Sequence, residues 1–145
     1  MDLTKAVNEI LIQFADECEL ALLAVENDVA KEAVKKLNKL SPKNPKSHGH
    51  KGRHYNQDWY IDVKNKKHYD HIIIANKQYQ LTHLLENGHN TIRNQRVVGH
   101  SKAQPHIKPV EEWAKEEVVA RAELYLGRIK KSNRMIVVKD LGGNS

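Results

Sequence analysis

The stretch "YQLTHLLENGH" (residues 79–89) decides the fold, together with "QPHIKP" (residues 104–109). In the first stretch Leu81, Leu84 and Leu85 recur at the spacing of a helix, which predicts about two helical turns with one apolar face. We expect the rest of the chain to be arranged around this short helix and the segment that follows it.

The residues after this helix predict a stop, a loop and a new helix. Asn87-Gly88 predicts the stop, because glycine accepts the left-handed conformation of a helix C-cap. The polar and basic segment 90–102 is then interpreted as a loop. Pro105 and Pro109 predict a rigid entry into a second helix, since proline suits the first turn of a helix but cannot continue a preceding one.

The composition indicates an intracellular protein with a lean core. The 145 residues predict one domain, and 39% hydrophobic content leaves a highly charged surface. No apolar run is long enough to cross a membrane, and the N-terminus does not resemble a signal peptide. The single cysteine, Cys18, excludes an internal disulfide and is interpreted as a small buried hydrophobe.

The net charge of +6 is unevenly distributed. Residues 1–30 hold seven acids and one base, a net of −6, whereas residues 31–56 hold eight bases and one acid, a net of +7. This order suits the macrodipole of a solvated helix. It also suits a basic end that meets an acidic protein surface or nucleic acid, and both interpretations stay open.

Apolar residues at alternating steps of three and four predict a long amphipathic helix over residues 3–40. The stripe consists of Leu3, Val7, Ile10, Phe14, Cys18, Ala21, Val25 and Val29, with Leu37 and Leu40 nearby. An unbroken helix would be on the order of 55 Å long, more than a small domain covers. Either the helix breaks near residues 26–28, or part of its stripe packs on another subunit.

The middle of the chain alternates between exposed and strand-like segments. Residues 41–57 are predicted to be a mobile basic loop, because they hold two prolines and two glycines and almost nothing apolar. Period-two alternation predicts a half-buried strand over 59–63, and the isoleucine-rich segment 69–75 predicts a second strand. Residues 96–98 are a candidate third strand or strand-like edge.

The final helix is predicted to begin at Pro109 and to be followed by a β-prone segment. Its expected buried face holds Val110, Trp113, Ala114, Val118, Ala122, Leu124 and Tyr125. The apolar run 135–138 is interpreted as a last strand or as an arm that pairs with a neighbouring molecule.

These elements predict an α+β fold in a single domain, residues 1–145. A long N-terminal amphipathic helix (1–40) and a basic loop (41–57) precede an α+β core (58–130), and a strand or arm (131–145) ends the chain. In the core, a small, mostly antiparallel sheet is expected to pack against the short helix and the long C-terminal helix.

The histidines are the only residues that suggest catalysis. His83, Glu86 and His89 have the wrong spacing for a metallopeptidase helix, which needs two histidines four residues apart. A metal site that combines His83 and His89 with His100 and His106 lacks the usual ligand spacings, as does the cluster His48, His50 and His54. We expect Glu86 to hydrogen-bond with His83 or His89 and to stabilise the loop, and we expect no enzyme activity, metal or cofactor.

The two opening stretches resemble the tail-completion (head–tail joining, neck) proteins of long-tailed, siphovirus-type bacteriophages. The resemblance covers about residues 50–127 and includes Val97-Val98-Gly99 and Glu111-Glu112-Trp113. Its defining residues are Tyr79, Leu81, His83, Leu84, Leu85, Glu86, Gly88, His89, Pro105, His106, Ile107 and Pro109. The chain departs from the family at residues 90–96, where family members are often rich in glycine.

The resemblance implies a structural virion protein that forms a homo-oligomeric ring, by family resemblance a hexamer, at the head–tail junction. The implied partners are the head connector or stopper and the tail terminator or tail tube, with genomic DNA in the lumen and no membrane. The implied location is the virion, and the host cytoplasm during assembly. Lys43, Lys46, Lys51 and Arg53 are the candidate residues that face a partner or DNA.

Two other functions stay open. A nucleic-acid-binding module would use residues 35–53 and the basic segment 90–102, and its affinity would fall steeply with salt. A metal-dependent nuclease built on the histidines would bind zinc or nickel stoichiometrically.

Overall fold

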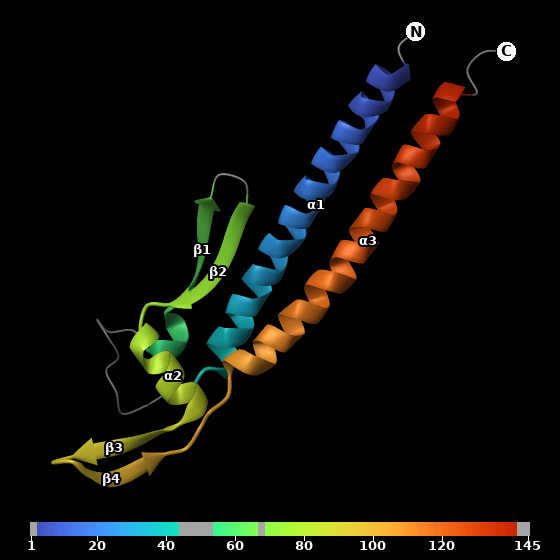
Figure 1. Cartoon of the computed structure of the whole chain (residues 1–145). Helices are drawn as coiled ribbons and strands as arrows, with labels where there is room; N and C mark the ends of the chain where they lie inside the picture. Colours follow the sequence, from blue (N-terminus) through green and yellow to red (C-terminus); the bar gives the residue numbers. More distant parts are fainter. Residues whose placement is uncertain (1–2, 44–53, 67–68, 142–145) are drawn as a thin grey trace. The chain divides into compact units, whose positions relative to one another are not determined.

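The structure of the protein is a computed structural model that describes residues 3–43, 54–66 and 69–141. In chain order, the structure contains α1 (Leu3–Leu40), η1 (Tyr55–Gln57), β1 (Trp59–Lys66), β2 (Tyr69–Asn76), α2 (Tyr79–Asn87), β3 (His89–Arg93), β4 (Arg96–Ser101) and α3 (Ile107–Leu141) (Figure 1). The predicted α+β class, with a long helix near each end and antiparallel strands between them, is confirmed. The strands form two separate two-stranded sheets, β1–β2 and β3–β4.

The chain divides into two compact units where one domain was predicted. One unit is continuous, Val29–Lys115, and the other combines residues 1–28 with 116–145. Both boundaries between the units fall inside long helices, α1 and α3.

The continuous unit holds the hydrophobic core. Ala33 and Leu37 of α1 pack with Tyr55, Trp59 and Val110. Half-buried side chains from other elements complete the core: Val34, Ile74, Leu85, Ile107 and Trp113. Every element of this unit except the β3–β4 hairpin contributes to the core, which explains how such short strands and helices are held together.

The C-terminal end of α1 is anchored by residues that the sequence placed in a loop. Ser41 donates its backbone N–H to Leu37 O (2.8 Å), and its hydroxyl accepts the indole N–H of Trp59 (2.8 Å). The Asn56 amide donates to Asn38 O (3.1 Å) and so satisfies a carbonyl at the helix end. The prediction of a loop over 41–57 is therefore wrong for residues 54–57, where η1 buries Tyr55 and Asn56. Residues 44–53 lie outside the described part of the chain.

The β1–β2 hairpin confirms the two predicted strands and leads into α2. The strands are antiparallel, and Trp59 lies opposite Asn76 at the end near α2. Asn76 donates its amide to Tyr55 O (2.9 Å) and accepts the backbone N–H of Gln78 (2.8 Å). These contacts fix the turn from which α2 starts.

The predicted basic loop over residues 90–102 is wrong for most of its length. Residues 89–101 form an antiparallel hairpin with a bulge between Thr91 and Ile92, and only residues 96–98 were expected to be strand-like. The turn residues Asn94 and Gln95 both have positive φ, 48° and 63°, as in a type I′ hairpin turn. The sequence concealed this turn because it lacks the glycine that usually marks one.

The predicted strand at residues 135–138 is also wrong. α3 begins at Ile107, before Pro109, and continues to Leu141, so the β-prone run belongs to the helix. Extending an established helix costs little per residue, and β propensity depends strongly on context. Leu124 and Tyr125, expected on the buried face, are 55% and 37% exposed. Residues 142–145, the end of the predicted arm, lie outside the described residues.

Candidate functional site

One polar cluster is the most highly organised among the described residues. It consists of Tyr55, Glu86, Gly88, His106 and the first turn of α3, and we call it the α2–α3 junction. The Glu86 carboxylate accepts three consecutive backbone N–H groups, from His106 (2.8 Å), Ile107 (3.0 Å) and Lys108 (3.0 Å). These donors have no partner within a helix, and the positive end of the helix dipole favours an anion. Glu86 therefore caps α3 from a position about twenty residues earlier in the chain.

His106 joins this cap to the core. Its Nδ1 lies 3.1 Å from Glu86 Oε2 and 2.8 Å from Gln104 O, two oxygens that only accept hydrogen bonds. Nδ1 therefore carries a proton, and the Tyr55 hydroxyl lies within hydrogen-bond distance of Nε2, at 2.9 Å. The rings of Tyr55, Trp59 and His106 pack edge to face at centroid distances of 5.5–6.0 Å.

The electrostatics of the junction favour an ionised Glu86. Partial burial acts to raise the pKa of Glu86, but the three backbone donors and nearby His106 outweigh it and lower that pKa below its ordinary value. Burial raises the pKa of the Tyr55 hydroxyl; a hydrogen bond with Thr82 opposes this rise, and the Glu86 charge adds to it. At neutral pH the junction therefore holds a carboxylate, a phenol and a helix N-terminus.

Gly88 allows the chain to pass through the junction. Its φ is 73° and its ψ is 167°, so it ends α2 as predicted, but in an extended positive-φ region and not in the left-handed helical one. A Cβ at this position would lie 2.6 Å from Ser101 O and 2.8 Å from Ala103 N. Only glycine fits, both for its backbone conformation and for the close approach of the segment before α3.

The residues of the family resemblance divide into two groups. The first group is buried or half-buried and consists of Leu85, Glu86, Gly88, His89, His106 and Ile107. A second group is exposed and consists of Tyr79, Leu81, His83, Leu84, Pro105 and Pro109. The expected bond from Glu86 to His83 or His89 is wrong, because its partners come from residues 106–108. His89 is half-buried, and its Nδ1 has no hydrogen-bond partner in the described structure.

The junction cannot act on a substrate in this structure. Tyr55, His106 and Glu86 form a hydrogen-bonded series of the kind that orients a catalytic group. However, His106 is 1% exposed and Tyr55 6% exposed, and both ring nitrogens of His106 are occupied. Among the described residues no group of three or more His, Cys, Asp or Glu side chains could hold a metal ion. Sequence reasoning missed Tyr55, which no periodicity marked.

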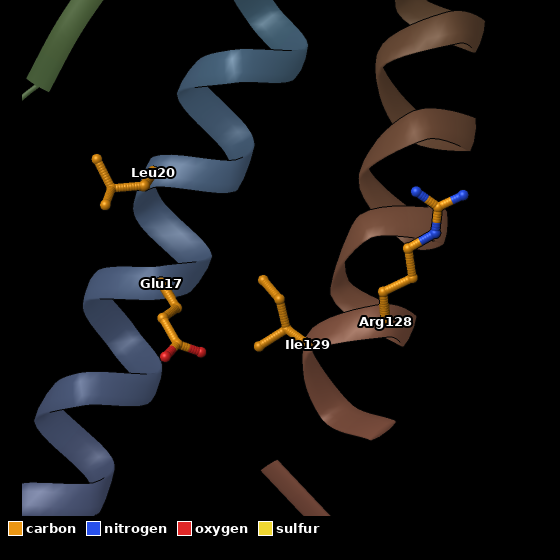
Figure 2. Close-up of a pocket in the computed structure, with 4 residues that line it drawn as sticks. All are labelled: Glu17, Leu20, Arg128 and Ile129. Atoms are coloured by element: carbon orange, nitrogen blue, oxygen red, sulfur yellow. The ribbon is translucent and has the colours of Figure 1, made fainter. Parts of the chain in front are cut away.

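A pocket of about 500 Å³ lies in the discontinuous unit and is lined by Glu17, Leu20, Arg128 and Ile129 (Figure 2). Glu17 and Ile129 point into the space between the two helices, whereas the guanidinium of Arg128 extends along α3. The Arg128 guanidinium lies over the Tyr125 ring at 5.6 Å. The lining combines one carboxylate, Glu17, and one guanidinium, Arg128, with two apolar side chains.

The N-terminal half of α1 exposes apolar side chains. α1 is continuous, so the alternative in which it breaks near residues 26–28 is wrong. Val25, Val29 and Leu37 are at most 4% exposed, as the stripe predicts. Towards the N-terminus the same stripe is exposed: Leu3 68%, Val7 52%, Ile10 50% and Phe14 37%. Cys18, predicted to be buried, is intermediate.

The candidate basic residues are only partly described. Lys43 is exposed, and Lys46, Lys51 and Arg53 lie outside the described residues. Arg93 and Arg96, at the tip of the β3–β4 hairpin, are exposed basic residues that the structure places directly opposite each other.

Comparisons of the chain with models of protein families, with curated proteins and with solved structures found no match. In the described part of the chain, no helix is long and apolar enough to span a membrane.

Proposed function

We propose that this protein is a structural virion protein that forms a ring at the head–tail junction of a long-tailed bacteriophage. The resemblance of residues 50–127 to tail-completion proteins motivates the proposal. The observation that supports it is the apolar N-terminal half of α1, where Leu3, Ile10 and Leu11 are each at least 50% exposed in the single chain.

An exposed stripe of this kind favours self-association. Burying apolar surface stabilises by about 25 cal/mol per Å², and soluble monomers rarely leave a long contiguous stripe in water. A symmetric ring covers such a stripe on every copy by the same contact. The ring, for which we propose six copies, would join the head connector or stopper to the tail terminator or tail tube, in the virion and in the host cytoplasm during assembly.

The α2–α3 junction supports a structural and not a catalytic role. It orders three chain segments around Glu86, which is half-buried, and His106, which is only 1% exposed. We propose that the resemblance arises from this structural junction, and that partners bind exposed surfaces outside the junction. No enzyme activity, cofactor or metal is part of the proposal.

Light scattering coupled to size exclusion tests the ring. The full chain should dissociate on dilution and, as its concentration rises, should reach the constant mass of a closed oligomer. The double variant Ile10→Glu/Phe14→Glu places charges on the stripe and should elute as a monomer. The control Asn8→Glu/Ala15→Glu adds the same charge off the stripe, at two exposed positions of α1, and should keep the oligomer. A wild-type chain that is monomeric at every concentration contradicts the proposal.

A further inference from the structure

The β3–β4 hairpin carries two positive charges, Arg93 and Arg96, for which the described part of the chain shows no ion pair. Every residue from Asn90 to Ser101 is exposed, including Arg93 and Arg96. Between Glu86 and Glu111 the sequence holds four Lys or Arg residues and no acid. Two of these four bases, Arg93 and Arg96, lie in the hairpin itself, at its tip, and the hairpin holds no acid.

The register places the two arginines on one face at the tip. Arg93 lies directly opposite Arg96, and like charges facing each other across an antiparallel pair are destabilising. The tip residues Asn94 and Gln95 have positive φ, which is unfavourable for residues other than glycine and for Gln95 in particular. An anion bound between the guanidinium groups would offset the repulsion.

The surroundings of the arginines allow a large anion to approach. Thr91 lies opposite Gly99 on the arginine face, so small side chains stand behind the charges. Ile92 and Val97 pair on the other face, next to the hydrogen-bonded pair Asn90 and His100 (2.8 Å). Neither strand of the hairpin carries a carboxylate that would repel a phosphate.

We propose that the tip of this hairpin binds the phosphate backbone of duplex DNA through Arg93 and Arg96. Guanidinium groups bind phosphate oxygens in a bidentate manner, and the major groove of B-DNA admits a two-stranded ribbon. The contact is sequence-independent. It goes beyond the proposed ring and does not depend on it, because the tip is exposed in the single chain.

Fluorescence anisotropy with a short labelled duplex of mixed sequence tests the proposal on the full chain. The slope of log affinity against log salt measures the phosphates contacted. Arg93→Gln/Arg96→Gln should lower the affinity about tenfold or more at low salt and reduce the slope by about two. Arg93→Lys/Arg96→Lys should retain most of the slope, because it keeps the charge.

The matched control is Lys130→Gln/Lys131→Gln, which removes two charges from exposed residues of α3. It should leave the slope unchanged, and circular dichroism should show that all three variants are folded. The proposal is overturned if Arg93→Gln/Arg96→Gln binds DNA as tightly as the wild type does. It is also overturned if the Lys→Gln control loses as much DNA affinity as Arg93→Gln/Arg96→Gln does. A wild-type chain that ignores DNA but binds polyglutamate also overturns it and favours an acidic protein partner. Because the mass of the wild type is measured separately, loss of DNA binding and loss of the ring are distinguishable.

Discussion

The α2–α3 junction and the β3–β4 hairpin are neighbours in the sequence but differ in almost every physical respect. In the junction, Glu86 accepts three backbone N–H groups and His106 has partners at both ring nitrogens. In the hairpin, residues 90–101 are all exposed, and two arginines face each other without a carboxylate on either strand. The resemblance residues of the junction, among them Glu86, Gly88 and His106, are buried or half-buried and hold the fold, whereas the hairpin offers an exposed surface.

The largest expected effect comes from Gly88→Ala. The new Cβ would meet backbone atoms at 2.6 and 2.8 Å, and alanine disfavours a φ of 73°. We expect a loss of about 2–5 kcal/mol in the free energy of unfolding, measured by urea denaturation. Gly127→Ala is the control, because its Cβ meets nothing within 4 Å, and it should stabilise α3 by about 1 kcal/mol. Equal effects of the two substitutions would show that the junction is no tighter than an exposed helix.

Glu86→Gln should have the next largest effect. It removes the charge that accepts the three N–H groups and turns an amide donor towards them, so we expect a loss of about 1–3 kcal/mol at neutral pH. Glu111→Gln is the matched control, since Glu111 is exposed and pairs only along the helix with Lys115 (2.6 Å). It should cost about 0.5 kcal/mol or less. A loss as small as that of the control would contradict the capping role.

The pH dependence of stability tests whether Glu86 caps α3 through its charge. The folded-state pKa of Glu86 is lower than its unfolded value, so its contribution is fully present above the unfolded pKa, about 4.3. That contribution is lost as the pH falls through the folded-state pKa. The difference in unfolding free energy between the wild type and Glu86→Gln should therefore shrink on acidification below pH 4, as denaturation at a series of pH values would show. A difference that stays constant over that range would mean that Glu86 does not act through its charge.

The smallest expected effect is a gain in the hairpin. Gln95 has a φ of 63°, which glycine adopts at no steric cost, so Gln95→Gly should stabilise the turn by about 0.5–1 kcal/mol. Amide exchange of residues 89–101 is the appropriate measurement, because the hairpin lies outside the core. Slower exchange with unchanged DNA binding is expected; faster exchange would mean that Gln95 is not strained.

The sequence predicted the elements whose signal is local. The stripe of α1, the alternation over 59–63 and the stop at Gly88 each follow from side chains within a few residues of one another. Apolar periodicity also separated Val25, Val29 and Leu37, which are buried, from the polar residues between them. It did not show where the stripe stops being covered, because that depends on elements elsewhere in the chain.

The contacts of the junction could not be predicted because they join distant segments. Nothing around Glu86 indicates that its partners are residues 106–108, and nothing in a proline- and glycine-rich segment indicates that Tyr55 reaches His106. The hairpin was missed because Asn94 and Gln95 adopt a turn that usually contains glycine. The run at 135–138 was misassigned because its local β propensity is overridden by the helix it continues.

Hydrogen–deuterium exchange of the full chain at low and high protein concentration tests the central claim most directly. The account predicts that the amides of residues 106–108 are protected at both concentrations and that those of the hairpin exchange rapidly at both. Residues 3–24 of α1 should gain protection as the concentration rises, because association covers their apolar stripe. Rapid exchange at 106–108 would contradict the rigidity of the α2–α3 junction. Protection in α1 that is independent of concentration would contradict association through its apolar stripe.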